Sequence, residues 1–312
     1  MQLAIVIPAF KVRFLSRTLD SLVAQTNRSF RVYIGNDNSP ECINDIVDAY
    51  RASLPITYQK FENNLGGEDL AGHWNRCIDL VDNETWVWLL PDDDIASPDC
   101  VEVVLNRVKA EGSQDRLYRF QSEHIDEEGN LLRTLPACPP LESSSEFITR
   151  KLRFERSSSV AEYVFNKKAF HAMGKFMSFP LAWGTDDMAW IKLGQAAGIT
   201  TLPAGRISLR QSRFNISGTK EKWVNQKFEA KYLFFQTLLQ DSSFRASLRG
   251  ENALASFRKE LATHFFYEYK SHRIKMGIRS IFALAAKNSC IMGGGYARNI
   301  YRLLRYKLKN AG

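Results

Sequence analysis

Cysteine is scarce in this chain, with five residues among 312, and their spacing matches neither a disulfide framework nor a metal knuckle. We therefore expect a reducing, cytoplasmic environment. The five histidines show no ligand spacing that would favour a zinc site, and no Cys/His arrangement suggests thiol catalysis. Long apolar runs are missing too. The first run, Leu3–Ile7, is far too short for the core of a signal peptide or for the roughly 20 residues of a spanning helix.

Acidic side chains are missing from the last part of the sequence, where none follows Glu268. The net charge of +8 is therefore unevenly distributed. Residues 1–212 hold 23 Lys and Arg against 28 Asp and Glu, whereas residues 213–312 hold 19 against 6. This asymmetry predicts two regions of the chain with different partners.

Apolar runs and helical stripes alternate through the first half of the sequence. Leu3–Ile7 is continuously apolar, as in a parallel strand that is covered on both faces. Further strands are predicted, with helical stripes between them, at Phe30–Ile34, Ile56–Phe61 and Thr85–Leu90. The alternation predicts an α/β fold, an open and mostly parallel sheet flanked by helices. From about Lys220 the pattern is helical, which predicts a C-terminal α-helical extension.

Acidic residues stand where two of these strands end. Asp37 follows the second strand and Asp92–Asp94 follow the fourth, at the sheet edge where ligands bind in such folds. Crowded carboxylates raise one another's pKa unless a cation relieves them, and Mg²⁺ and Mn²⁺ bind a few carboxylates plus substrate phosphates. The cluster therefore indicates a cation bridge to a diphosphate, with a solvated acidic turn as the alternative. For Asp37 the alternative is an Asx turn with Asn36 and Asn38.

A second acidic pair, Asp186 and Asp187, precedes an apolar helical stripe. One of them could act as a general base facing an acceptor hydroxyl. Alternatively, Thr185 or Asp186 caps the helix, where acidic residues are favoured. His73 lies in another predicted helix, where it could touch a phosphate, although a histidine on the helix surface is the commoner case.

Six segments, in this order and spacing, resemble motifs of the family 2 glycosyltransferases, which have the GT-A fold. The resemblance runs from residue 3 to about 217. Its segments are Ile5–Phe10 ("IPxY/F"), Leu19–Thr26 ("SLLxQT"), Asn36–Ser39 ("DDxS"), Asn64–Gly66 with Asn75 ("NxG…N"), Leu89–Asp94 ("DxD-type") and Gly184–Asp186 ("GED"). Three positions differ from the family pattern, because Asn36, Pro91 and Thr185 replace acidic residues.

The resemblance implies a role for individual residues. Asp37 is implied to contact the nucleotide base, and Asp92 to face the ribose or sugar of the donor. Asp93 is implied as the ligand of Mn²⁺ or Mg²⁺, and Asp186 as the general base, with Asp187 as the alternative. The other implied donor-binding residues are Pro8, Phe10, Asn64, Gly66 and Asn75.

The function implied by the resemblance is inverting, metal-dependent transfer of a sugar from a nucleotide diphosphate sugar, expected to be a UDP-sugar. The acceptor would be a hydroxyl of a saccharide or of a lipid-linked molecule, in surface polysaccharide biosynthesis. Two alternatives stay open. The missing acids at Asn36 and Pro91 allow a catalytically inactive binding module. A sugar-nucleotide pyrophosphorylase would require a glycine-rich loop where this chain has Pro8-Ala9-Phe10-Lys11.

The expected domains are a GT-A catalytic domain at 1–217 and a basic helical region at 218–312. Basic residues beside apolar helix stripes suit an anionic membrane surface, which would place the protein in the cytoplasm, peripherally on the inner face of the cell membrane. The alternative is a helical bundle that covers the catalytic domain. No motif for nucleic-acid recognition is present, so nucleic acid is not an expected partner.

Overall fold

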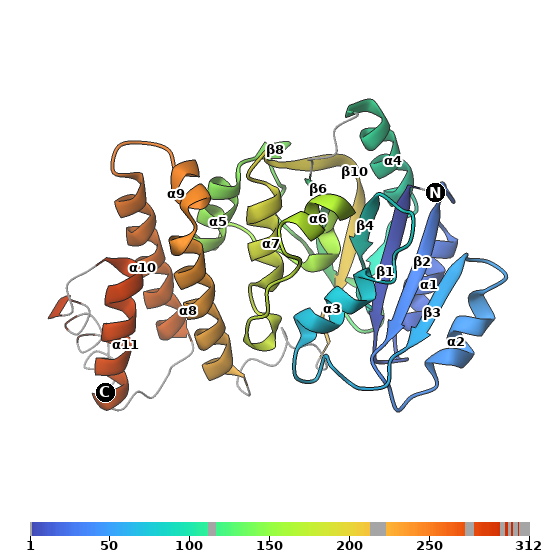
Figure 1. The fold of residues 1–312 in the computed structure, drawn as a ribbon, viewed down its shortest axis with the longest axis horizontal. Helices are drawn as coiled ribbons and strands as arrows, with labels where there is room; N and C mark the ends of the chain where they lie inside the picture. Colours follow the sequence, from blue (N-terminus) through green and yellow to red (C-terminus); the bar gives the residue numbers. More distant parts are fainter. Residues whose placement is uncertain are drawn as a thin grey trace.

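The computed structural model describes residues 2–111, 117–212, 223–271 and 278–293, together with 297, 298, 301 and 305. In this part of the chain, ten strands form one sheet with the order β3-β2-β1-β4-β9-β6-β10-β5, while β7 pairs with β6 and β8 with β10 (Figure 1). The strands are β1 Leu3–Ala9, β2 Phe30–Asn36, β3 Ile56–Lys60, β4 Trp86–Leu89, β5 Ile95–Ala96, β6 Leu117–Ile125, β7 Leu131–Thr134, β8 Leu141–Glu142, β9 Tyr163–Asn166 and β10 Ile199–Arg210.

The sheet is mostly parallel, as the sequence predicts. β3, β2, β1 and β4 are parallel neighbours, and β6 is parallel to β10, whereas β9 runs antiparallel between β4 and β6. The predicted continuous apolar strand Leu3–Ile7 is fully buried. Its side chains alternate between two cores, because Ala4 and Val6 pack on one face of the sheet and Leu3, Ile5 and Ile7 on the other.

Helices cover both faces of the sheet. The core on one face contains side chains of α1, α2 and α4, and the core on the other face contains side chains of α3, α5, α6 and α7. The α-helices that precede β10 are α1 Leu15–Val23, α2 Ile43–Tyr50, α3 Leu70–Ile78, α4 Cys100–Glu111, α5 Ser144–Leu152, α6 Lys167–Ala172 and α7 Thr185–Leu193, with 3₁₀ turns at Val160–Glu162 and Pro180–Ala182.

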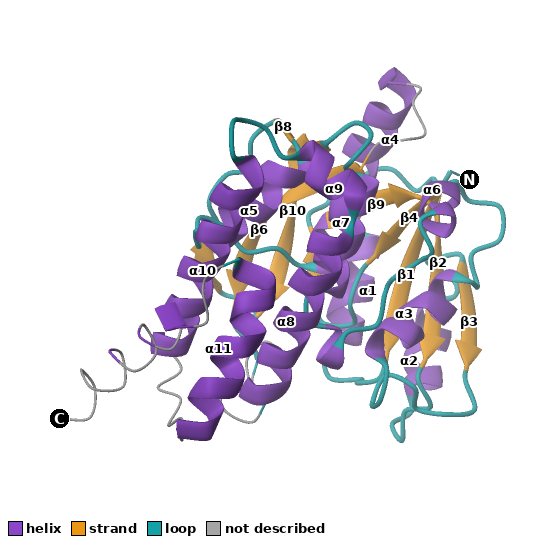
Figure 2. Cartoon of the chain, turned by 60° about the vertical axis from the view of Figure 1, so that its left-hand side comes forward, coloured by secondary structure: helices purple, strands orange, loops and turns teal. Residues whose placement is uncertain are grey.

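The predicted C-terminal helical extension is present as α8 Val224–Gln240, α9 Ser242–Ser247, α10 Ala253–Ser271 and α11 Ile278–Met292. Figure 2 shows α8, α10 and α11 beside α5 and α7, at the end of the molecule away from β3. Phe234, Leu238 and Phe265 belong to the same core as Trp190 of α7. The predicted boundary at 217/218 lies outside the described residues. The described helices include none that is long and apolar enough to cross a membrane.

Helix α7 points its first turn toward the edge at which the parallel strands end. α6 starts at the opposite edge, where the Lys167 amide donates to the carbonyl of Thr85 just before β4. After α7, the short segment 194–198 leads directly into the start of the parallel strand β10. α7 therefore runs antiparallel to β10 and carries Asp186 toward the carboxyl edge of the sheet.

Candidate active site

The Asp92 carboxylate joins the ends of β1 and β4. Its Oδ2 accepts hydrogen bonds from the backbone amides of Phe10, at 2.9 Å, and Lys11, at 3.1 Å. Burial raises the pKa of Asp92, and these two amides oppose the rise. The bonds bring the first residues after β1 against the acidic turn after β4, so the two strand ends form one surface.

The next two aspartates differ in their partners. Asp94 Oδ1 accepts from the Arg210 amide at 2.9 Å, which fastens the acidic turn to the end of β10. Apart from its own backbone amide, no described residue donates a hydrogen bond to the Asp93 side chain. Burial and the neighbouring Asp92 raise the pKa of Asp93 to about 7, against the opposing charges of Lys11 and Arg210. Asp93 is therefore the carboxylate of this turn that is left for a cation.

The donor set at Asp93 fits one type of metal binding. The described residues include no group of three His, Cys, Asp or Glu side chains that could hold a metal ion by themselves. Mg²⁺ commonly binds proteins through one or two carboxylates and completes its shell with substrate phosphates and water. Asp93 is a single carboxylate with a raised pKa, so it fits a metal that is also bound by substrate phosphates and water. A divalent cation there would offset the negative charge of the neighbouring Asp92.

Asp37 is buried and held on several sides. Its Oδ1 accepts from the Leu65 amide at 2.9 Å and from the Arg76 guanidinium, and its Oδ2 accepts from the Gly66 amide at 2.8 Å. The Asx-turn interpretation of Asp37 is therefore wrong. Asn36 Oδ1 instead accepts from the amide of Ser39, three residues further along the chain, at 2.8 Å. Asp37 brings the end of β2 together with the loop before α3.

His73 lies behind Asp37, and the prediction of a histidine on the helix surface is wrong. Its side chain is 3% exposed, and its Nδ1 lies 3.2 Å from Asp37 Oδ1. Burial lowers the pKa of His73 to about 4, although the carboxylate of Asp37 opposes the shift. At neutral pH His73 is therefore uncharged and packs against Asp37 without neutralising it.

Sequence reasoning missed Arg76, which supplies the positive charge beside Asp37. The Arg76 guanidinium lies over the ring of Phe61, 3.9 Å from its centroid, and also donates to the carbonyl of Asn63 at 2.9 Å. Arg76 is three residues after His73 in α3, so the two side chains share a helix face. That spacing is the signal in the sequence, although it does not by itself identify Asp37 as the shared partner.

The remaining donor-binding residues implied by the resemblance lie around the same strand ends. Phe10 is 36% exposed beside Asp92, and Pro8 is in register with Gly35 of β2. The Asn64 side chain accepts from the Gly67 amide at 2.8 Å. Both polar atoms of the Asn75 side-chain amide bond to the backbone of Phe176, at 2.9 and 3.0 Å. Their roles toward a donor stay predictions.

One lysine binds only one member of the acidic pair at the start of α7. Lys151 Nζ lies 2.5 Å from both carboxylate oxygens of Asp187. Among the described residues, no side chain bonds to Asp186, whose carboxylate has only the backbone amides of Asp187 and of Asp186 itself as hydrogen-bond partners. Burial and the adjacent Asp187 raise the pKa of Asp186 to about 7, and Lys151 opposes this rise.

The capping interpretation of this segment is wrong. Gly184 occupies the N-cap position of α7 with φ at 88°, and no side chain caps the helix there. The Thr185 hydroxyl instead donates to the carbonyl of Met177 at 2.9 Å. Asp186 and Asp187 both stand inside the first helical turn.

A series of hydrogen bonds connects the Asp37 region to the start of α7. Asp69, the N-cap of α3, follows the loop that binds Asp37, and its Oδ1 accepts from the Ser178 hydroxyl at 2.7 Å. Ser178 is next to Met177, to which Thr185 bonds. Together with the Asn75–Phe176 pair, these bonds fasten the segment before Asp186 to α3, so the acidic groups are parts of one connected structure.

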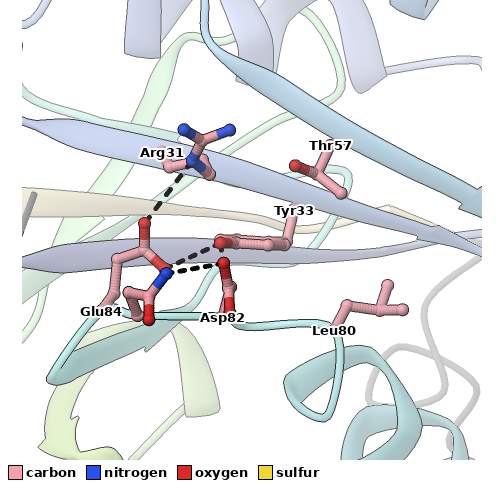
Figure 3. Close-up of a pocket in the computed structure, with 7 residues that line it drawn as sticks. Arg31, Tyr33, Thr57, Leu80, Asp82 and Glu84 are labelled. Atoms are coloured by element: carbon pink, nitrogen blue, oxygen red, sulfur yellow. Dashed lines mark hydrogen bonds and ion pairs between the residues drawn. The ribbon is translucent and has the colours of Figure 1, made fainter.

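A polar cavity of 490 Å³ lies away from these acids (Figure 3). It is near the start of β4, at the amino edge of the sheet, and its lining includes Arg31, Tyr33 and Glu84. Glu84 accepts from the Tyr33 hydroxyl at 2.7 Å and pairs with Arg31 at 3.5 Å. These polar groups satisfy one another, so this cavity is not the candidate active site.

Comparison with known proteins identifies the family. The model of "Glycosyl transferase family 2" matches residues 4–176, and the chain belongs to this family, as the sequence motifs predict. A Processive diacylglycerol beta-glycosyltransferase of Mycoplasma pneumoniae is 26% identical over 113 residues, which are 35% of this chain and 32% of that protein. The matched region thus spans about a third of the length of that relative.

Solved structures confirm the fold. Residues 1–349 of TarS from S. aureus, crystallised in complex with UDP-GlcNAc, superpose with a TM-score of 0.73 at 14% identity, covering 100% of this chain and 92% of that one. GalNAc-T7, crystallised with UDP, GalNAc and Mn²⁺, gives a TM-score of 0.52 at 11% identity, covering 86% of this chain and 56% of that one. The GT-A fold predicted from the motifs is confirmed.

Proposed function

We propose that this chain is an inverting, metal-dependent glycosyltransferase that moves a sugar from a UDP-sugar to an acceptor hydroxyl. The observation that carries the proposal is the pair of half-buried carboxylates, Asp93 and Asp186, that have raised pKa values and no side-chain bonding partner among the described residues. Asp93 is suited to bind a cation and Asp186 is suited to accept a proton, and the proposed reaction requires both.

The nucleotide base of the donor binds at Asp37 in this proposal. The Asp37 Oδ2 atom accepts one backbone hydrogen bond, from Gly66, and a carboxylate oxygen can accept a second. A base N–H or a ribose hydroxyl can supply it. UDP as the nucleotide is supported by the UDP-GlcNAc complex of TarS and the UDP complex of GalNAc-T7.

The diphosphate binds over the acidic turn after β4. Asp93 holds Mn²⁺ or Mg²⁺ there, and the ion, when bound, supplies positive charge to the phosphates of the leaving nucleotide. The Mn²⁺ complex of GalNAc-T7 supports this choice of cofactor. Asp92, held by the amides of Phe10 and Lys11, keeps the turn in place.

Asp186 is the general base of the proposed reaction. It takes the proton of the acceptor hydroxyl while that oxygen attacks the anomeric carbon from the face opposite the nucleotide. The bond to the diphosphate breaks with its electron pair on the leaving oxygen, so the configuration inverts. A pKa of about 7 is well matched to this task, because the base is partly ionised at neutral pH and still accepts a proton readily. The bond between Asp187 and Lys151 supports the choice of Asp186 over Asp187 as the base.

The acceptor in this proposal is a saccharide or a lipid-linked molecule in surface polysaccharide biosynthesis, and the enzyme works in the cytoplasm at the inner face of the cell membrane. The support is the basic C-terminal region, which holds 19 Lys and Arg against 6 acids in residues 213–312, and the diacylglycerol in the name of the Mycoplasma relative. Much of that region lies outside the described residues, including the predicted apolar stripe at Ile300, Leu303, Leu304 and Leu308.

Replacing Gly66 by Ala is expected to weaken UDP binding by about tenfold or more, measured by calorimetry. An added Cβ would lie 2.6 Å from Asp37 Oδ2 and obstruct the oxygen that is proposed to meet the nucleotide. Glu68→Ala, at an exposed residue of the same loop, is the control. Equal UDP affinities of the two variants would contradict the assignment of Asp37.

Asp93→Ala is expected to abolish the gain in donor binding that Mn²⁺ provides, because the variant lacks the carboxylate ligand. Calorimetric titration of UDP with and without Mn²⁺ measures the gain. Asp48→Ala removes a carboxylate from the exposed face of α2 and serves as the control. If Mn²⁺ strengthens UDP binding equally in wild type and Asp93→Ala, Asp93 is not the ligand.

Asp186→Asn is expected to lower turnover by roughly 10²–10⁴-fold while UDP binding survives, because the amide cannot accept the proton. In the wild type, the rate is expected to fall as pH drops below about 7, since protonation of Asp186 removes the base. A panel of UDP-sugars assayed from pH 5 to 9 tests both statements. Near-normal turnover of Asp186→Asn would remove Asp186 from the mechanism.

The chain is expected to co-sediment with anionic lipid vesicles at low salt and to be released as salt rises, because the attraction is electrostatic. Neutral vesicles are the control. Absence of binding to the anionic vesicles at low salt would contradict the membrane part of the proposal without affecting the reaction.

A further inference from the structure

Two lysine–acid pairs lie at the first turn of α7. One joins α5 to α7, and the other joins α8 to α10. Lys151 of α5 holds both oxygens of Asp187 at 2.5 Å, and Lys231 of α8 pairs with Glu268 of α10 at 2.7 Å. The charges of Lys151 and Asp187 both act on the pKa of Lys231, so the two pairs belong to one cluster. The start of α7 is thereby linked to helices that follow the family match.

A histidine ties the same helices together near Lys151. His264 of α10 places its Nδ1 2.9 Å from the carbonyl of Leu152, the residue after Lys151, and its Nε2 3.8 Å from Glu268. The ring of Phe154 stacks on His264 with the centroids 4.6 Å apart. Burial lowers the pKa of His264 to about 4, so this contact is uncharged at neutral pH. It fixes α10 against the end of α5, from which Lys151 extends.

We propose that Lys151 is a positioning residue for Asp186, acting through Asp187, and that α8 and α10 hold Lys151 in place. This inference rests on the proposed role of Asp186 as the base. None of the family motifs in the sequence includes Lys151, Lys231 or Glu268, and the last two lie beyond the segment that the family model matches.

The helix geometry explains how one lysine can serve one acid and leave the other free. Successive residues of an α-helix point about 100° apart, so Lys151 can bind Asp187 fully while Asp186 faces another direction. Two ionised carboxylates in adjacent positions repel each other, and the lysine cancels that repulsion at Asp187. Asp186 then ionises near neutral pH without an ion pair of its own that an acceptor hydroxyl would have to displace.

A purely structural ion pair is the competing explanation, and the chain contains one for comparison. Lys175 Nζ lies 2.6 and 2.8 Å from the two carboxylate oxygens of Asp79, at the surface. Both pairs have a lysine across two carboxylate oxygens, but Asp79 is not adjacent to a second acid in the sequence. Lys175→Met is therefore the matched control for Lys151→Met.

The test is the pH dependence of turnover in Lys151→Met, Asp187→Asn and Lys175→Met. The charged groups that act on Asp186 are Asp187 on its own helix and Lys151 on α5, and these two in turn act on Lys231 of α8, which pairs with Glu268 of α10. Lys151→Met removes a cation, so the acidic limb is expected to move up by about one pH unit, with turnover at pH 7 about fivefold lower. Asp187→Asn removes an anion, so the limb is expected to move down. Lys175→Met is expected to move it in neither direction.

The proposal would be supported if the acidic limb moves in opposite directions in Lys151→Met and Asp187→Asn, with UDP affinity unchanged and partial recovery in Lys151→Arg. Damage to packing alone does not shift the limb in opposite directions. An unshifted limb in Lys151→Met, or shifts of both variants in the same direction, would overturn it. If Lys151→Met fails to fold, Asp187→Asn decides alone, and an upward or absent shift overturns the proposal. Full activity of Asp186→Asn would instead refute the proposed base, which is a separate outcome.

Discussion

Carboxylates packed closely at one edge of a sheet repel one another. The candidate site is organised by the amides and cationic side chains that offset the negative charge of each carboxylate. Asp92 is bound by the two amides that follow β1, and Asp94 by the amide of Arg210. Arg76 compensates Asp37, and Lys151 compensates Asp187. The hydrogen bonds of Asp92 come first among these, because they hold the segment that follows β1 against the acidic turn that follows β4.

Two carboxylates are left without such a partner in the described part of the chain, and these are the ones that the proposed chemistry uses. Asp93 and Asp186 are half-buried beside another carboxylate, and the pKa of each rises to about 7. A carboxylate in this condition destabilises the folded state unless something binds it. A divalent cation would relieve Asp93, and a proton from the acceptor would relieve Asp186. The acids that have a compensating partner therefore have structural roles, and the two that have none have the proposed chemical roles.

The sequence predicts the sheet well because buried parallel strands leave a local signal. Leu3–Ile7 is apolar at every position, since both faces are covered, and the acids after β2 and β4 mark the carboxyl edge. The partners of those acids are less predictable, because they come from distant segments. The burial of His73 depends on packing against Asp37, 36 positions away in the sequence. Lys151 lies a similar distance from Asp187, and no local pattern distinguishes Asp187 from Asp186.

The C-terminal helices pack against the preceding part of the chain more closely than a division at residue 217 implies. Phe234 of α8 packs against Gly184, where an added Cβ would meet its ring at 3.1 Å, and Gly184 is the N-cap of the helix that carries Asp186. Its φ of 88° already favours glycine, so both the backbone and the neighbouring helix constrain this position. Because α8 and α10 also hold the ion pairs around Lys151, a change in these helices would reach the proposed base directly. The basic region is thus part of the structure that presents Asp186, whatever surface its exposed side chains contact.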